Sequence, residues 1–189
     1  DAVKSGKLRR ELGISKDKII VTSVGRVVKA KGHDYAIEAI KRIKDPDFVF
    51  VIVGDGPYTE VYQKQLKEEI AQKRVFVLGS RSDVKEILKD SDVFLFTTLN
   101  ENHSLALMEA VNMHCTVIAT NVGGNPEIIQ GDETGLLIPK MDIDSIQKAL
   151  IKLKDKNLRT EFTEKAYDYC RSKFCEENTY GKLDNIFSK

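Results

Sequence analysis

The chain has 189 residues, a length that suits one domain or a small pair of domains, and its 41% hydrophobic content is enough for a buried core. The net charge of +1 arises from interspersed acidic and basic side chains, so bulk electrostatics give no reason to expect nucleic-acid binding. No apolar run approaches the ~20 residues of a membrane span, and no signal peptide is recognisable. The three cysteines lack metal-ligand spacing and are typical of reduced thiols in a cytoplasmic protein.

The first part of the chain alternates apolar runs with amphipathic segments. Residues 1–18 are polar and basic, which predicts a linker with a short helix. Ile19–Val24 is a continuous apolar and β-branched run of the kind buried in parallel sheets, and a helix is expected from about His33 to Ile43. A second strand is predicted at Phe48–Val53, followed by a helix at about Thr59–Gln72.

The rest of the chain continues the same alternation, which predicts the α/β fold class. We expect a Rossmann-like, doubly wound parallel six-stranded sheet in one domain, residues 1–189, with C-terminal helices over 155–189. The remaining predicted elements are strands at Val75–Leu78, Val93–Phe96, Thr116–Thr120 and Gly135–Pro139, and helices at Val84–Leu88, from near Ser104, at about Pro126–Gln130, Ile143–Lys154 and Leu158–Phe174, with a last segment to Phe187.

The turn after the fourth predicted strand carries the strongest chemical signal. Glu101 lies in this turn, a helix opens near Ser104, and Glu109 lies five residues further along that helix. A helix N-terminus presents unpaired backbone N–H groups and the positive end of its dipole, which favour an anion. A ligand with phosphate at the helix tip and sugar hydroxyls beside the helix would meet both carboxylates.

The loop after the first predicted strand is expected at the same place. In a sheet of strand order 3-2-1-4-5-6, ligands bind at the carboxyl ends of strands one and four, where the chain reverses direction across the sheet. Gly25 ends the first strand, and the loop that follows carries Arg26 and Lys31. Two cations and a helix N-terminus describe a diphosphate site, and neighbouring carboxylates describe hydroxyl binding. Together they predict a nucleotide sugar.

Other motifs are better explained by structure. Gly54-Asp55-Gly56 lacks the third glycine of a dinucleotide fingerprint, so we interpret it as a loop lining the cleft and do not expect NAD. Asp45-Pro46-Asp47 and Asp142-Ile143-Asp144 fit a turn and a helix cap, so no metal site is expected. We interpret His33 and His114 as structural and keep His103 as a functional candidate.

Glu101 and Glu109, eight residues apart in a strand–turn–helix setting, resemble the E-x7-E motif of retaining GT-B glycosyltransferases of the family 4 type (glycosyl transferases group 1). Asn121–Glu127 downstream and Val24–Arg26 and Lys31–Gly32 upstream support the resemblance. It covers nearly the whole chain with several motifs in order, and it implies the C-terminal, donor-binding half of a GT-B fold. The resemblance also implies a metal-independent transfer with retained anomeric configuration and no cofactor beyond the nucleotide sugar.

The resemblance assigns roles residue by residue. Glu109 would hold the ribose hydroxyls, Glu101 would contact the transferred sugar, and Arg81 would meet the base. The departing diphosphate would be bound by the two loop cations and by the backbone at the start of the motif helix. The donor-binding set is Gly25, Arg26, Lys31, Gly54, Arg81, Glu101, Asn102, His103, Ser104, Leu105 and Glu109, with Arg26, Lys31 and Glu101 as catalytic residues.

The chain departs from the family pattern at three places. Asn102-His103-Ser104 stands where the family often has Gly-Phe-Gly or Gly-Phe-Pro, which leaves the donor sugar open. His114 replaces the glycine that commonly ends the motif helix, and His tolerates a left-handed conformation. Thr116 replaces a frequent proline before the fifth strand.

The resemblance also says what 189 residues do not provide. GT-B enzymes carry the acceptor on a separate N-terminal domain, so this chain alone is expected to bind a UDP-, GDP- or ADP-sugar and to transfer nothing. The acceptor would be a glycan or lipid-linked, in cell-envelope polysaccharide synthesis, with peripheral membrane association of the full-length enzyme. Three alternatives stay open: a GT-B sugar-nucleotide epimerase, a non-catalytic nucleotide-sugar-binding module, and a glycosidase whose two carboxyls would lie ~5–5.5 Å apart.

Overall fold

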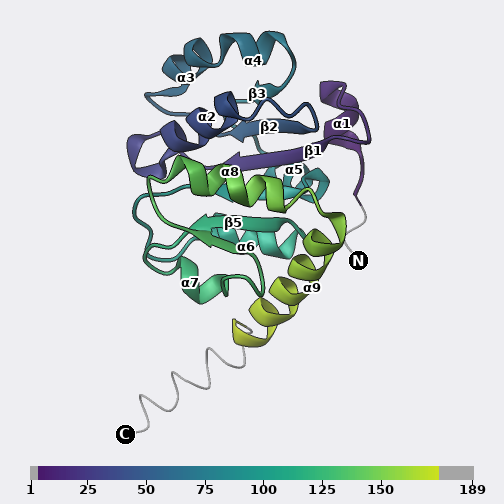
Figure 1. Cartoon of the computed structure of the whole chain (residues 1–189), viewed down its shortest axis with the longest axis vertical. Helices are drawn as coiled ribbons and strands as arrows, with labels where there is room; N and C mark the ends of the chain where they lie inside the picture. Colours follow the sequence, from purple (N-terminus) through teal and green to yellow (C-terminus); the bar gives the residue numbers. More distant parts are fainter. Residues whose placement is uncertain (1–3, 175–189) are drawn as a thin grey trace, which may run out of the picture.

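The computed structural model describes residues 4–174, and its centre is one parallel six-stranded sheet. The strand order is β3-β2-β1-β4-β5-β6, and every neighbouring pair is parallel. Figure 1 labels β1, β2, β3 and β5 of this sheet among the surrounding helices. The predicted doubly wound sheet is confirmed. The strands are β1 (Ile19–Val24), β2 (Phe48–Val53), β3 (Val75–Val77), β4 (Val93–Phe96), β5 (Thr116–Thr120) and β6 (Leu136–Ile138).

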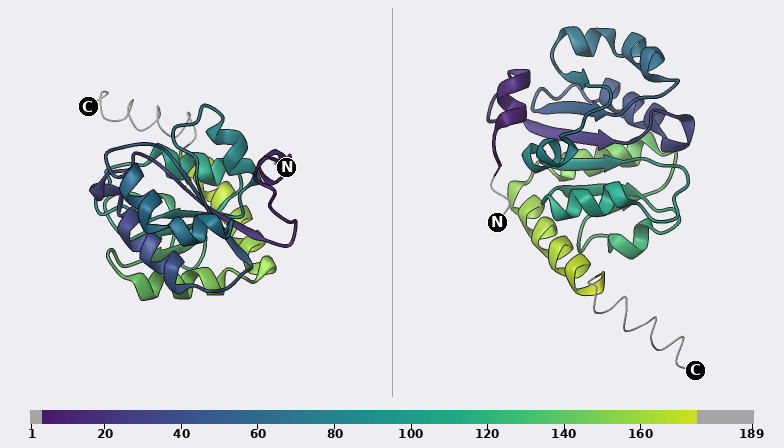
Figure 2. Two further views of the ribbon diagram at one scale, coloured as in Figure 1. Left: turned by 90° about the horizontal axis from the view of Figure 1, so that it is seen from above. Right: turned by 180° about the vertical axis from the view of Figure 1, so that it is seen from behind.

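Helices cover both faces of this sheet because side chains along each strand alternate between the faces. Ile19 and Val21 pack with α2 and α8, which lie in front of the sheet in Figure 1, whereas Ile20 packs with α1 and α5. Figure 2 (right) shows the face that carries α1, α5 and α6. The helices are α1 (Lys7–Leu12), α2 (His33–Arg42), α3 (Thr59–Gln65), α4 (Lys67–Ala71), α5 (Val84–Asp90), α6 (Leu105–Asn112), α7 (Asn125–Ile128), α8 (Ile143–Lys152) and α9 (Lys156–Lys173), with a 3₁₀ helix, η1, at Lys29–Lys31.

The helix predicted over Thr59–Gln72 is wrong as one continuous element. It is divided at Leu66, whose φ of −100° and ψ of 15° depart from helical values. The hydrogen bonds from Leu66 N to Tyr62 O (2.9 Å) and from Ile70 N to Leu66 O (2.8 Å) continue through the break. Leu66 is fully buried, so the kink accompanies the burial of its side chain in the core. The predicted segment ending at Phe187 lies outside the described residues.

The amino-terminal segment is attached to the amino end of β4 by two carboxylates. The buried Asp90 accepts hydrogen bonds from the backbone N–H groups of Gly6 (2.8 Å) and Leu8 (2.9 Å). Asp92 accepts from Arg9 (2.8 Å) and from Ile20 N (2.8 Å). The predicted short helix is present as α1, and these bonds hold it against α5.

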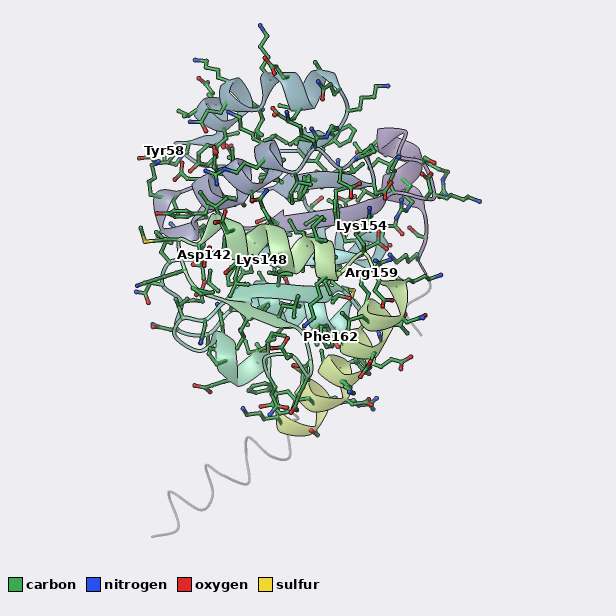
Figure 3. The ribbon with its side chains drawn as sticks, viewed as in Figure 1. Tyr58, Asp142, Lys148, Lys154, Arg159 and Phe162 are labelled. Carbon is green, nitrogen blue, oxygen red and sulfur yellow. The ribbon has the colours of Figure 1, made fainter. Side chains whose placement is uncertain are left out.

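The two edges of the sheet are distinguished in Figure 3. Tyr58, which follows β2, and Asp142, which follows β6, lie at one side of the molecule, whereas Lys154 and Arg159 lie at the other. The first side is the carboxyl edge, where the loops after all the parallel strands gather. Asp142 caps α8 by accepting from Ser145 N (2.9 Å), which confirms its predicted capping role.

His33, the first residue of α2, is the least satisfied polar side chain of the core. It is 2% exposed, and neither ring nitrogen has a hydrogen-bond partner among the described residues. Its ring lies 6.1 Å from that of Tyr62. Burial lowers the pKa of His33 from 6.5 to about 4, so the folded protein holds it neutral. The structural interpretation of His33 agrees with this environment.

We expect His33 to make the fold acid-sensitive. Between pH 6.5 and about 4, His33 is protonated in the unfolded chain but neutral in the folded chain. The free energy of unfolding therefore falls as the pH falls through this window. The full loss is about 3 kcal/mol. Urea unfolding at pH 7, 6, 5 and 4 should show a shallower pH slope for His33→Leu than for the wild type. His103→Gln, a change in an exposed histidine, should keep the wild-type slope, and equal slopes for all three proteins would contradict the prediction.

Candidate functional site

The turn between β4 and α6 forms the centre of the candidate site. Ser104 is the N-cap of α6, and its hydroxyl accepts a hydrogen bond from Leu107 N (3.2 Å). This confirms the predicted start of the helix near Ser104. Leu105, the first helical residue, is 71% exposed, so the helix tip faces solvent. The cap occupies Leu107 N, whereas the backbone N–H groups of Leu105 and Ala106 have no intrahelical acceptor and are available to an anion.

The loop after β1 brings a cation to this turn. Lys31 Nζ lies 2.5 Å from Glu101 Oε2, and the two side chains are 24% and 17% exposed. The Lys31 ammonium also lies 5.3 Å from the centre of the Phe96 ring. The predicted meeting of a cation from the β1 loop with a carboxylate from the β4 turn is therefore observed. A partly buried ion pair of this kind is more firmly held than an exposed one, because solvent screens it less.

A pair of glycines after β5 supports the backbone of the turn. Gly123 has a φ of 51°, and a Cβ atom there would lie 1.6 Å from Glu101 O. A Cβ at Gly124 would lie 2.1 Å from Asn102 O, and Gly124 N donates to Glu101 O (3.2 Å). The candidate set did not include either glycine. Two adjacent glycines directly after a strand are a signal of close backbone approach that was present in the sequence.

A second close approach, to the backbone of Gly25, explains the predicted donor-binding glycine Gly54. A Cβ at Gly54 would lie 1.9 Å from Gly25 O, and Gly54 has a φ of 133°. Gly25 N donates to Val53 O (3.0 Å), and Gly54 N donates to Gly79 O (2.8 Å). The loops after β1, β2 and β3 are thus in direct backbone contact. Glycine is required at Gly54 by this packing, whatever ligand the cleft receives.

Arg81 is the predicted residue that the structure places in another network. Its guanidinium group is bonded to Asp83 (2.8 Å) and to Glu11 (2.7 Å) of the amino-terminal segment. The hydrogen bond and charge of Arg81 lower the pKa of Asp83, and the Asp83 side chain makes no capping hydrogen bond to α5. Arg81 is not joined to the Lys31–Glu101 pair. Stacking of its planar group on a base stays a prediction.

The remaining predicted side chains are exposed to solvent. Arg26, Asn102 and Glu109 are exposed, and no ion pair joins Arg26 to another described residue. The His103 ring, also exposed, packs edge-on against Phe174 at the end of α9, with 5.5 Å between ring centres. The structure thus brings Lys31 and Glu101 into contact and leaves these four side chains exposed. Within residues 4–174, no cluster of three or more His, Cys, Asp or Glu side chains is arranged to hold a metal.

Replacing Gly123 should disturb the site more than replacing a glycine of similar conformation. Gly123→Ala forces a Cβ against Glu101 O, whereas Gly79 has a φ of 66° and open space around its missing Cβ. Gly79→Ala should therefore lower the free energy of unfolding only by the cost of the left-handed conformation, about 1–2 kcal/mol. Gly123→Ala should lower the free energy of unfolding, measured by urea unfolding, by distinctly more than this. Equal losses would show that the Glu101 backbone yields without resistance.

Comparison with known proteins places this arrangement in a family. The family model described as Glycosyl transferases group 1 matches residues 4–169. A curated relative, the UDP-Gal:alpha-D-GlcNAc-diphosphoundecaprenol alpha-1,3-galactosyltransferase of Escherichia coli, is 36% identical over 160 residues, which cover 82% of this chain and 41% of that protein. The chain therefore spans less than half of this relative's length.

Solved structures agree with the fold. Anabaena Alr3699/HepE in complex with UDP superposes with a TM-score of 0.86 at 20% identity, over 97% of this chain and 52% of that one. The C-terminal domain of a glycosyl transferase group 1 family protein (LpcC) from Francisella tularensis has a TM-score of 0.74 at 25% identity, over 89% of this chain and 93% of that domain. With its parallel sheet, its paired lysine and glutamate and its family match, the chain belongs to the glycosyl transferases of group 1.

Proposed function

We propose that this chain is the donor-binding domain of a retaining glycosyltransferase that takes its sugar from a nucleotide diphosphate sugar. The observation that carries the proposal is the contact between Lys31 and Glu101 (2.5 Å) beside the N-terminus of α6. A cation, a carboxylate and a helix tip then face one point at the carboxyl ends of β1 and β4. In doubly wound sheets that point is where ligands bind.

The diphosphate is assigned to the positive side of this arrangement. Lys31 and Arg26 supply formal charge, and the first turn of α6 at Ser104 and Leu105 supplies N–H donors and the helix dipole. Charge develops on the nucleotide diphosphate as the glycosidic bond to it breaks. Groups already placed to receive that charge stabilise the transition state more than the ground state. On this account the reaction needs no metal ion and no further cofactor.

The hydroxyl groups of the donor are assigned to the carboxylates and their neighbours. Glu109, on the exposed side of α6, accepts the ribose hydroxyls, and Glu101 accepts a hydroxyl of the transferred sugar. Asn102 and His103 follow Glu101 in the same turn and are exposed, and we assign them to the transferred sugar as well. These assignments follow the family motif and agree with the placement of the turn. They also require Glu101 to exchange its Lys31 partner, at least in part, for the sugar.

The acceptor and the cellular setting are proposals for the whole protein. The Escherichia coli relative is named for a UDP-Gal donor and a diphosphoundecaprenol-linked acceptor. We infer a glycan or lipid-linked acceptor for this protein too, in cell-envelope polysaccharide synthesis at the cytoplasmic face of the membrane, with peripheral association. None of the helices in the described part of the chain is long and apolar enough to cross a bilayer. Because an acceptor domain is needed for transfer, this chain alone should transfer no sugar.

The first test is binding of nucleotides to this chain. A thermal-shift panel of UDP, GDP, ADP and their sugars should identify one nucleotide. At 100 times its dissociation constant, a ligand adds about 2.7 kcal/mol of stability. UDP leads the panel because solved structures of the same fold hold it. A panel without any shift at millimolar ligand would overturn the proposed function.

Glu109 should contribute specifically to nucleotide affinity. Glu109→Ala removes the acceptor proposed for the ribose hydroxyls and should weaken binding of the selected nucleotide by roughly 1.5–3 kcal/mol, the range for hydrogen bonds to charged groups. Glu68→Ala, another exposed helical glutamate, on α4, serves as the control and should bind as the wild type does. Isothermal titration calorimetry measures both. Unchanged affinity in Glu109→Ala would refute the ribose assignment.

Lys31 and Glu101 should act in opposite directions on a nucleotide without a sugar. Lys31→Met removes a phosphate ligand and should weaken UDP binding roughly tenfold or more, since each tenfold is about 1.4 kcal/mol. Glu101→Gln removes the carboxylate that competes with the diphosphate for Lys31 (2.5 Å), so it should tighten UDP binding several-fold. The same variant should bind the UDP-sugar with less advantage over UDP. Weaker UDP binding in Glu101→Gln would contradict this competition.

A further inference from the structure

Two buried threonines at the end of β4 have hydroxyl groups aimed at the neighbouring loop. Thr97 is 2% exposed and Thr98 is 0% exposed. Thr97 Oγ1 donates to Gly32 O (3.0 Å) and lies 3.3 Å from Lys31 O. Thr98 Oγ1 lies 3.2 Å from Ala30 O and 3.0 Å from Asn100 O, between which its single proton is shared. Both side chains therefore bond to the backbone that carries Lys31.

The backbones of the two loops are in contact at the same place. Leu99 N donates to Ala30 O (2.8 Å). A Cβ atom at Gly32 would lie 2.0 Å from Thr97 O, and Gly32 has a φ of 66°, so glycine permits the approach. The loop that carries Lys31 is consequently fastened along residues 30–32 to the turn that carries Glu101.

Residues at the end of β5 also hydrogen-bond to this segment. Thr120 Oγ1 donates to Thr98 O (2.6 Å), and Asn125 Nδ2 donates to Thr120 O (2.9 Å). Hydrogen bonds thus run from the start of α7 through the ends of β5 and β4 to the β1 loop. The turn between Thr98 and Glu101 is held by residues from β5 and from the loops after β1 and β5, the two strands that flank β4.

A valine at either threonine would suit a buried strand end equally well in shape. Burying a hydroxyl group lowers stability unless the group is hydrogen-bonded. Here the hydrogen bonds go to carbonyl oxygens of the Lys31 segment. We propose that Thr97 and Thr98 are positioning residues, whose hydroxyl groups hold the β1 loop so that Lys31 meets Glu101 and the donor diphosphate. The inference rests on the proposed function of this site.

The test compares threonine variants at opposite ends of the sheet in the whole 189-residue chain. Thr98→Val and Thr97→Val remove the hydroxyl and keep the branched shape. Ala30 O retains its bond from Leu99 N, so the variants should fold. Thr116→Val is the matched control: Thr116 is 1% exposed and its hydroxyl bonds to Arg159 O (3.0 Å) and Thr163 (2.9 Å) at the amino end of β5.

UDP affinity, measured by titration calorimetry, is the readout. Thr98→Val and Thr97→Val should bind UDP about tenfold more weakly than the wild type, while Thr116→Val loses stability but keeps its affinity. Thr98→Ser, which restores the hydroxyl, should return affinity to within twofold of the wild type. Wild-type affinity in both valine variants at positions 97 and 98 would overturn the proposal, as would an equal loss in Thr116→Val.

A second readout separates this proposal from the proposed function. If the wild type binds no nucleotide at all, the function is wrong, and the positioning role is then tested through the ion pair itself. A double-mutant cycle of Lys31→Met and Glu101→Gln, followed by urea unfolding, measures the coupling between the two side chains. The coupling should be present in the wild-type background and lost in the Thr98→Val background. Equal coupling in both backgrounds would overturn the positioning role.

Discussion

The contact between Lys31 and Glu101 depends on the parallel register of β1 and β4. The two residues are 70 positions apart in the chain, and they meet because both strands end at the same edge of the sheet. Neither side chain is on a strand or held by one helix alone. Each is carried by a loop, and the loops are fixed by glycines and threonines that bring backbone to backbone. Backbone contacts between the loops therefore determine where the charged side chains of the site lie.

This assembly has an electrostatic consequence. An ammonium and a carboxylate that are 24% and 17% exposed satisfy each other in the free protein. In the proposed function, the dianionic diphosphate of the donor would compete with the Glu101 carboxylate for Lys31. That exchange would leave Glu101 next to the sugar that we propose is transferred, without a long movement of the chain. A loop held at several points is suited to this role, because only the side chains need to reorient.

Much of the fold was predictable from the sequence because its cues are local. β1, β2, β4 and β5 begin and end at the predicted residues, since each apolar run is bounded by polar or glycine positions. The positive φ of His114 (59°) was expected from its place after the motif helix. The convergence of the β1 loop with the β4 turn followed from the strand order and a family resemblance. These predictions required no knowledge of side-chain contacts.

What the sequence could not provide were contacts between distant segments. The sequence did not reveal that α1 docks beside Arg81 and pairs it with Glu11. Thr97 and Thr98 look like ordinary strand residues until the position of Ala30 is known. The kink at Leu66 arises within a segment of helical pattern and reflects burial that periodicity does not register. Each of these features depends on which distant segment packs against the residue, and a local sequence pattern does not contain that information.

The docking of the amino-terminal segment has a practical consequence for dissecting this protein. Burial by itself would raise the pKa of Asp90, yet hydrogen bonds from Leu8, Gly6 and Ser5 outweigh it and keep the pKa low. A fragment cut at Ile19, where the sheet begins, would remove these three donors together with the segment that carries them. A fragment that keeps these hydrogen bonds has to include the chain from Ser5 onward. A fragment boundary chosen from the sheet alone would remove the amino-terminal segment and its hydrogen bonds to Asp90.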